Sequence, residues 1–246
     1  MFCTRCGTKN PDSSANCYNC GQNLTKAPDR NLQSRSGTLV ETRPLPAPKE
    51  FGKVDVNGSI LVATEKEISF NGQTLATPTI TGIRYGIYKH YLNGIRTSQS
   101  YCIWLCDEKN SMQIECPAGF LISNGEIEQS YKDALAALWP AVVYPIVGQW
   151  IDALSEGRDF WVGDVSFDKS GLLRLVDKWF EVEKDQKFLA WTDCGGHKCS
   201  SGNIHLLRGK KIWASLSLRD TWNAVCLDPL FSYLYEDGRL WQFVNR

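Results

Sequence analysis

The chain is poor in the residues and motifs on which most enzymes depend. Its 246 residues include only three histidines. We find no P-loop, no dinucleotide-binding glycine fingerprint, no H-E-x-x-H and no G-x-S-x-G sequence. The chain therefore offers few side chains for general acid–base catalysis, although a motif search does not detect residues that come together only after folding. We expect a protein that is not an enzyme and has no catalytic residues.

The chain also lacks net charge and an export signal. Its 27 Lys and Arg side chains balance 27 Asp and Glu side chains, which argues against a surface that binds a polyanion throughout but leaves local basic patches open. The first residues have no basic n-region, no apolar h-region and no cleavage site. We therefore expect a cytoplasmic protein whose thiols stay reduced.

Cysteine, in contrast, is abundant, with ten residues. Cys3 and Cys6 form one C-x2-C pair, and Cys17 and Cys20 form a second pair ten residues further on. Two such turns aim four thiolates at one point, which predicts a closed tetrahedral Zn²⁺ site. A redox-active pair and a disulfide framework are the alternatives. So short a segment cannot bury a core, and the metal would supply its folding energy.

The sequences FCTRCG and NCYNCG resemble the short N-terminal zinc ribbon of many bacterial and archaeal proteins. The resemblance covers residues 1–24 and implies a structural metal and a docking surface for protein or nucleic acid, not catalysis. Residues 25–50 are rich in Pro, Ser and Thr and end in Pro-Leu-Pro-Ala-Pro, which predicts a flexible, partly extended linker.

Residues 51–156 are predicted to form strands followed by a long helix. Short β-rich runs alternate with turns, of which Asn71-Gly72 is a strong hairpin signal. Tyr101–Cys106 is apolar on both faces, typical of a buried strand. From Ile127 to Leu154, apolar residues recur every three or four positions after a capping box that begins at Ser123.

Two prolines, Pro140 and Pro145, should kink or divide this helix. Its stretch from 134 to 151 is long enough to span a membrane. The prolines, the flanking Asp133 and Asp152 and the lack of a basic cluster favour a core-facing helix instead. No integral membrane span is expected.

Residues 157–246 repeat the order of strands and then a helix, with the helix predicted from Asp220 to Gly238. A bent seven-stranded sheet closed by a C-terminal helix is the pleckstrin-homology-like (PH-like) plan. Residues 51–156 and 157–246, here called the first and second β units, resemble that plan in element order alone. The predicted fold class is therefore α+β, with a zinc ribbon followed by two mainly antiparallel, barrel-like β units. The resemblance implies a scaffold that binds peptides or lipid headgroups.

A second group of candidate metal ligands lies in the second β unit. Cys194, His197 and Cys199 are close in sequence, and His205 follows. Short Cys/His spacings with glycines can surround a second zinc ion. We nevertheless expect an ordinary glycine-rich loop between strands here, with the metal site and a thiol activated by His197 and Lys198 as the alternatives.

A basic and aromatic stretch supplies the candidate ligand contacts. Its members, which interleave cations with tyrosines, are Arg84, Tyr88, Lys89, Tyr91 and Arg96. Such residues can stack on bases and neutralise phosphates, but we expect instead a long hairpin tip whose tyrosines cover the barrel.

These observations predict a non-enzymatic, zinc-binding adaptor that binds a protein partner through its ribbon and its β units. One alternative is a nucleic-acid-binding regulator that uses the ribbon and residues 84–96. Another is a peripheral module on an anionic membrane.

Overall fold

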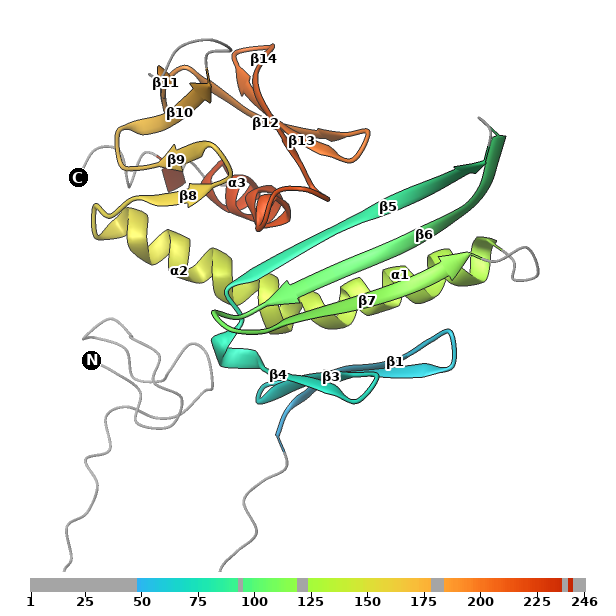
Figure 1. Ribbon diagram of the computed structural model, residues 1–246. Helices are drawn as coiled ribbons and strands as arrows, with labels where there is room; N and C mark the ends of the chain where they lie inside the picture. Colours follow the sequence, from blue (N-terminus) through green and yellow to red (C-terminus); the bar gives the residue numbers. More distant parts are fainter. Residues whose placement is uncertain (1–47, 93–94, 119–123, 178–183, 236–238, 241–246) are drawn as a thin grey trace, which may run out of the picture. The chain divides into compact units, whose positions relative to one another are not determined.

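A computed structural model describes residues 48–92, 95–118, 124–177, 184–235 and 239–240. These residues belong to one compact body that extends from residue 47 to 246. They form four antiparallel sheets and a set of helices (Figure 1), which confirms the α+β class. The four ribbon cysteines and nearly all of the linker lie outside the described residues, so both stay predictions.

The first sheet consists of four strands hydrogen-bonded in sequence order. They are β1 (Glu50–Val56), β2 (Ser59–Thr64), β3 (Glu67–Phe70) and β4 (Gln73–Ala76). The predicted hairpin turn at Asn71-Gly72 is confirmed, since both residues have positive φ and Phe70 pairs with Gln73. Asn57-Gly58 makes the same kind of turn between β1 and β2. Alternate side chains of this sheet are buried, including Leu61, Ala63, Ile68, Phe70 and Leu75.

A short 3₁₀ helix, η1 (Thr77–Thr79), leads into the second sheet. This sheet consists of β5 (Gly82–Leu92), β6 (Ile95–Cys106) and β7 (Ser111–Ala118), with β6 in the centre. In β6, Ile103 and Leu105 are fully buried on one face and Cys102 is buried on the other. The prediction of a strand covered on both faces is confirmed.

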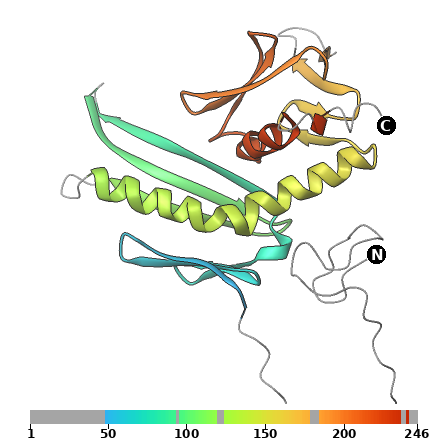
Figure 2. The ribbon, with the colours of Figure 1, turned by 180° about the vertical axis from the view of Figure 1, so that it is seen from behind.

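One long helical stretch closes the first β unit. It consists of α1 (Asn124–Leu138), the π-helical segment η2 (Trp139–Val143) and α2 (Tyr144–Ser155), which lie end to end (Figure 2). The predicted interruption takes the form of the π-helical segment, and Pro140 and Pro145 are the second residues of η2 and α2. At Gly52 of β1, an added Cβ would lie 2.6 Å from the Cβ of Ala137, so α1 packs directly on the strand backbone.

The second β unit again contains a four-stranded and a three-stranded antiparallel sheet. The first contains β8 (Phe160–Val162), β9 (Val165–Phe167), β10 (Gly171–Asp177) and β11 (Lys184–Ala190). The second contains β12 (Cys194–Ser200), β13 (Asn203–Arg208) and β14 (Lys211–Ser217). A 3₁₀ turn, η3 (Ala224–Cys226), and α3 (Leu227–Tyr235) follow.

A column of aromatic rings joins α2 to the second β unit. Trp150 of α2 stacks on Phe160 of β8 at 4.6 Å, and Phe160 stacks on Phe167 of β9 at 5.0 Å. Phe167 meets Phe231 of α3 edge-on, and all four rings belong to one continuous hydrophobic core. The long helix therefore contributes to the core of both units.

Two predictions in the second β unit are wrong. The glycine-rich stretch at residues 194–199 is a strand, β12, and not a loop. The last helix begins at Leu227 rather than near Asp220, because the backbone at Asn223 is left-handed, with a φ of 63°, and interrupts a continuous helix. The predicted strand at residues 179–182 and the capping residue Ser123 lie outside the described residues.

The helical stretch Gly125–Ser155 is long and apolar enough to cross a membrane, by length and composition alone. Half of its most apolar window is buried inside the protein, including Leu138, Val142 and Ile146. Core helices of globular proteins meet the same criterion, so these properties do not identify the helix as a membrane span.

Candidate functional site

The structure separates the two groups of candidate residues that lie within the described chain. One group, on β5, faces a segment of the second β unit. The other, on β12, faces the beginning of α3.

Arg84 of β5 is held between two indole rings. Its guanidinium carbon lies 5.1 Å from the ring centroid of Trp104 on β6 and 4.5 Å from that of Trp222 in the second β unit. Its Nε is buried without a hydrogen-bond partner. Stacking between aromatic faces suits the planar Arg head group, which therefore joins the two β units.

Tyr88, on the same strand, is also engaged within the protein. The guanidinium of Arg219 lies 5.0 Å from its ring centroid, and the indole of Trp104 meets the ring edge-on at 5.6 Å. Arg219 belongs to residues 217–223, here called the clip segment, which connects β14 to η3.

The clip segment hydrogen-bonds to β5, the edge strand of its sheet. The Tyr85 amide donates to the Leu218 carbonyl at 3.1 Å, and the Asn223 amide donates to the Ile83 carbonyl at 2.8 Å. The side chain of Asn223 accepts from the Ile83 amide at 2.9 Å and donates to the Thr81 carbonyl at 2.8 Å. The clip segment thus covers an edge that would otherwise present unpaired backbone groups.

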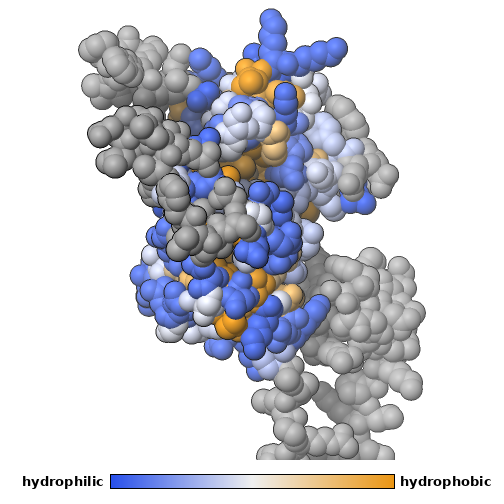
Figure 3. Space-filling view, turned by 90° about the vertical axis from the view of Figure 1, so that its right-hand side faces the viewer, coloured by the Kyte–Doolittle hydropathy of each residue, from blue (hydrophilic) through white to orange (hydrophobic). Residues whose placement is uncertain are grey.

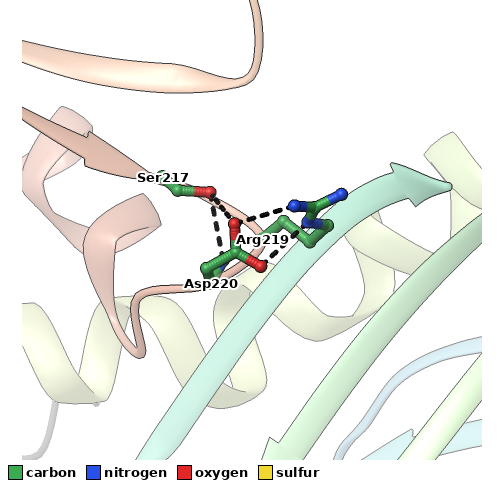
Figure 4. A network of polar contacts seen from close by, with 3 residues as sticks. All are labelled: Ser217, Arg219 and Asp220. Atoms are coloured by element: carbon green, nitrogen blue, oxygen red, sulfur yellow. Dashed lines mark hydrogen bonds and ion pairs between the residues drawn. The ribbon is translucent and has the colours of Figure 1, made fainter.

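A local polar network shapes the clip segment (Figure 4). The Arg219 side chain donates two hydrogen bonds to the Asp220 carboxylate, at 2.9 and 3.0 Å. The Ser217 hydroxyl donates to the same carboxylate at 2.8 Å and accepts from the Asp220 amide. These contacts, to Arg219 and then Ser217, lower the pKa of Asp220 below its ordinary value.

Two of the five predicted contact residues, Arg84 and Tyr88, therefore make contacts inside the protein. Lys89 is exposed on β5. Tyr91 and Arg96 pair with each other across β5 and β6, and their side chains are outside the described part. A ligand contact by these residues stays a prediction.

The strand β12 needs its glycines to pair closely with its neighbour. A side chain at Gly195 would collide with the carbonyl oxygen of Gly209, and Gly196 has a φ of 90° beside a bulge in the register. Beyond the bulge, His197 pairs with Leu206 and Cys199 with Ile204. His197 and Cys199 therefore share one face of β12.

On that face the two side chains meet Asp228 in the first turn of α3. The His197 Nε2 lies 2.7 Å from the Asp228 Oδ1, and the Cys199 Sγ lies 3.7 Å from the same oxygen. One potential ligand atom from each of the three residues lies within 4.8 Å of the others. We call this group the β12–α3 cluster.

The structure does not bring all four predicted ligands of the second metal site together. His205 pairs with Lys198 on the opposite face of β12, where its ring nitrogens contact the hydroxyls of Ser200 and Ser215. Cys194 precedes the bulge and is buried, with its thiol directed at the Gly196 carbonyl. Strand alternation thus accounts for the exclusion of His205, and the bulge sets Cys194 apart.

The sequence did not identify Asp228 as a candidate ligand. It indicated only that a helix could begin near this residue. Asp followed by Pro229 is typical of a helix start, but no local pattern places that start against β12.

The contacts of Cys199 disfavour its thiolate form. Burial, followed by the charge of Asp228, raises the pKa of the Cys199 thiol to about 11. Lys198, the expected activating cation, lies on the other face. The cluster instead combines imidazole, thiol and carboxylate groups, which are the donors that bind zinc in proteins.

No family model, curated protein or solved structure matched the chain.

Proposed function

We propose that the protein is a non-enzymatic, zinc-binding adaptor of the cytoplasm. In this proposal a four-cysteine ribbon is tethered to two PH-like β units, and both parts bind a protein partner. The Zn²⁺ of the ribbon is structural and is held by Cys3, Cys6, Cys17 and Cys20.

The order of elements supports the PH-like part of the proposal. In each β unit, a four-stranded sheet and then a three-stranded sheet precede a helix. In the first unit, α1 contacts strands of both sheets, as a closing helix of that plan does.

The observation that carries the binding role is a pair of exposed aromatic side chains on the sheet β8–β11, Trp161 on β8 and Phe188 on β11. Trp161, Ser166, Leu173 and Phe188 occupy one register row across the four strands. Trp161 and Phe188 are each 47% exposed. Seen from one side, the protein surface is largely polar, with apolar side chains confined to small areas (Figure 3). Exposed aromatic residues are enriched in protein interfaces.

A quantitative pulldown tests this function with the intact chain as bait. We expect the Trp161→Ser/Phe188→Ser variant to lose partners that the Ile60→Ser variant keeps. Ile60 serves as the control, since it is also an exposed apolar residue but lies in the first β unit. Partners lost by Cys3→Ser/Cys6→Ser belong to the ribbon. The same captured proteins at equal yield with all three variants would contradict the proposal.

Salt and vesicles separate the alternatives. Nucleic-acid binding with an affinity that falls steeply and log-linearly with salt would favour a regulator. Flotation with anionic liposomes would favour a membrane module. Arg84 already stacks on two indole rings and Tyr88 on Arg219, so two side chains that either alternative would use are engaged within the protein.

A further inference from the structure

We propose that His197, Cys199 and Asp228 bind one divalent metal ion, for which zinc is the best fit. This site is separate from the N-terminal ribbon, and it does not depend on the adaptor function.

Two secondary-structure elements bring the three donors to one point. His197 and Cys199 are two residues apart on β12, so strand alternation directs both to the face on which α3 packs. Asp228 lies in the first turn of α3 and reaches back to both. A metal ion placed there would bridge the strand and the helix.

The spacing of the donor atoms suits a tetrahedral ion. Zinc bonds of about 2.0 to 2.3 Å place neighbouring ligand atoms about 3.3 to 3.8 Å apart. The thiol and the carboxylate oxygen are already 3.7 Å apart. The imidazole and the carboxylate, at 2.7 Å, need to separate by about half an ångström, which side-chain rotation supplies.

The chemistry of the donors selects among ions. Magnesium and calcium prefer oxygen ligands, whereas thiolate with imidazole favours zinc. Three protein ligands leave a fourth position for water or for a side chain of a partner. The Asp228 side chain is 52% exposed and the His197 side chain 17%, so the ion can enter from solvent.

Neighbouring contacts hold the donors in place. Phe231, one turn after Asp228, lies 5.3 Å from the His197 ring and fixes the face that the ring presents. The Tyr235 hydroxyl, one further turn along α3, donates to the Cys194 carbonyl at 2.9 Å. Both contacts tie β12, which carries two of the donors, to α3, which carries the third.

The test uses the full chain with all four ribbon cysteines changed to serine, so that only the second site is observed. We expect it to bind about one Co²⁺ per chain, with a thiolate-to-cobalt charge-transfer band that excess Zn²⁺ removes. Cys199→Ser should abolish the band, and His197→Gln and Asp228→Asn should each weaken cobalt binding at least about tenfold. His205→Gln is the matched control and should bind as the parent does.

Several results would overturn the proposal. They are the absence of cobalt binding by the folded parent, an unchanged band in Cys199→Ser, or a loss of binding in His205→Gln. If the parent without ribbon cysteines fails to fold, the same substitutions are made in the chain that keeps these cysteines, and its zinc content is measured. The zinc content must fall by about one ion per chain in Cys199→Ser and stay constant in His205→Gln. A ribbon without metal would leave this result unchanged, so the two sites are tested independently.

Discussion

Arg84 on β5 and His197 on β12 both stand on edge strands, and both contact residues distant in sequence, yet their surroundings differ. Arg84 is enclosed between two indole rings, and its strand edge is covered by the clip segment. His197, Cys199 and Asp228 lie together at a place that solvent reaches. The contact at Arg84 should therefore stabilise the protein, and the β12–α3 cluster should bind a ligand.

The largest expected effect concerns Asn223, which fastens the clip segment to β5. Asn223→Ala removes two hydrogen bonds and leaves the Ile83 amide and the Thr81 carbonyl unpaired. We expect the free energy of unfolding to fall by about 2 to 3 kcal/mol in urea titrations. Asn223→Gly, which tolerates the positive φ, should cost about half as much. Equal costs would show that the side-chain hydrogen bonds account for the whole loss.

A smaller effect is expected at Gly86, where the clip segment approaches β5 most closely. An added Cβ would lie 2.6 Å from the Cβ and 3.3 Å from the Cα of Arg219. Gly86→Ala should therefore destabilise the protein by about 1 to 3 kcal/mol, measured by the same titration. An added Cβ at Gly148 of α2 would meet no atom within 4 Å apart from its chain neighbours and the nearby backbone of its own helix, so Gly148→Ala should leave stability equal or higher. If Gly86→Ala behaves like this control, the close contact is absent in solution.

The β12–α3 cluster should respond to metal instead. In the variant without ribbon cysteines, zinc at ten times its dissociation constant should stabilise the fold by about 1.4 kcal/mol, seen as a rise in Tm. Cys199→Ser should show no such rise, although its metal-free stability should match that of the parent. Asn223→Ala should keep the full response to zinc. A response lost in Asn223→Ala would mean that the two regions are not independent.

The strands show which features local sequence can predict. Asn71-Gly72 and the alternation around Ile103 are local signals, and both predicted the observed structure. β12 was mistaken for a loop because Cys194-Gly-Gly-His-Lys-Cys199 has little β-propensity, and its strand form depends on pairing with β13. Non-local pairing of this kind leaves no short-range pattern.

The candidate residues follow the same rule. The stretch around Arg84 supplies candidate ligand contacts by sequence, but Trp222 and Arg219, which lie more than 100 residues away in sequence, contact it in the fold. Asp228 approaches His197 across 31 residues. Both contacts depend on tertiary packing, which the periodicity and spacing of residues in the sequence do not predict.

The smallest expected effect is on the pH dependence of stability. The contacts to Arg219 and Ser217 lower the folded-state pKa of Asp220 below its ordinary value of 3.8. Its stabilising contribution is therefore present above the ordinary pKa and is lost as pH falls through the folded-state pKa. Because the ion pair is exposed, Asp220→Asn should change the free energy of unfolding at pH 7 by no more than about 0.5 kcal/mol. Below the folded-state pKa of Asp220, the variant and the parent should have the same free energy of unfolding. A difference that persists there would not come from the charge of Asp220.

The metal content of the intact chain, prepared without oxygen, tests the central claim most directly. We expect about two zinc ions per chain, and about one in both Cys3→Ser/Cys6→Ser and Cys199→Ser. Clearly less than one zinc ion per chain in the intact protein would contradict the account of a zinc-binding protein.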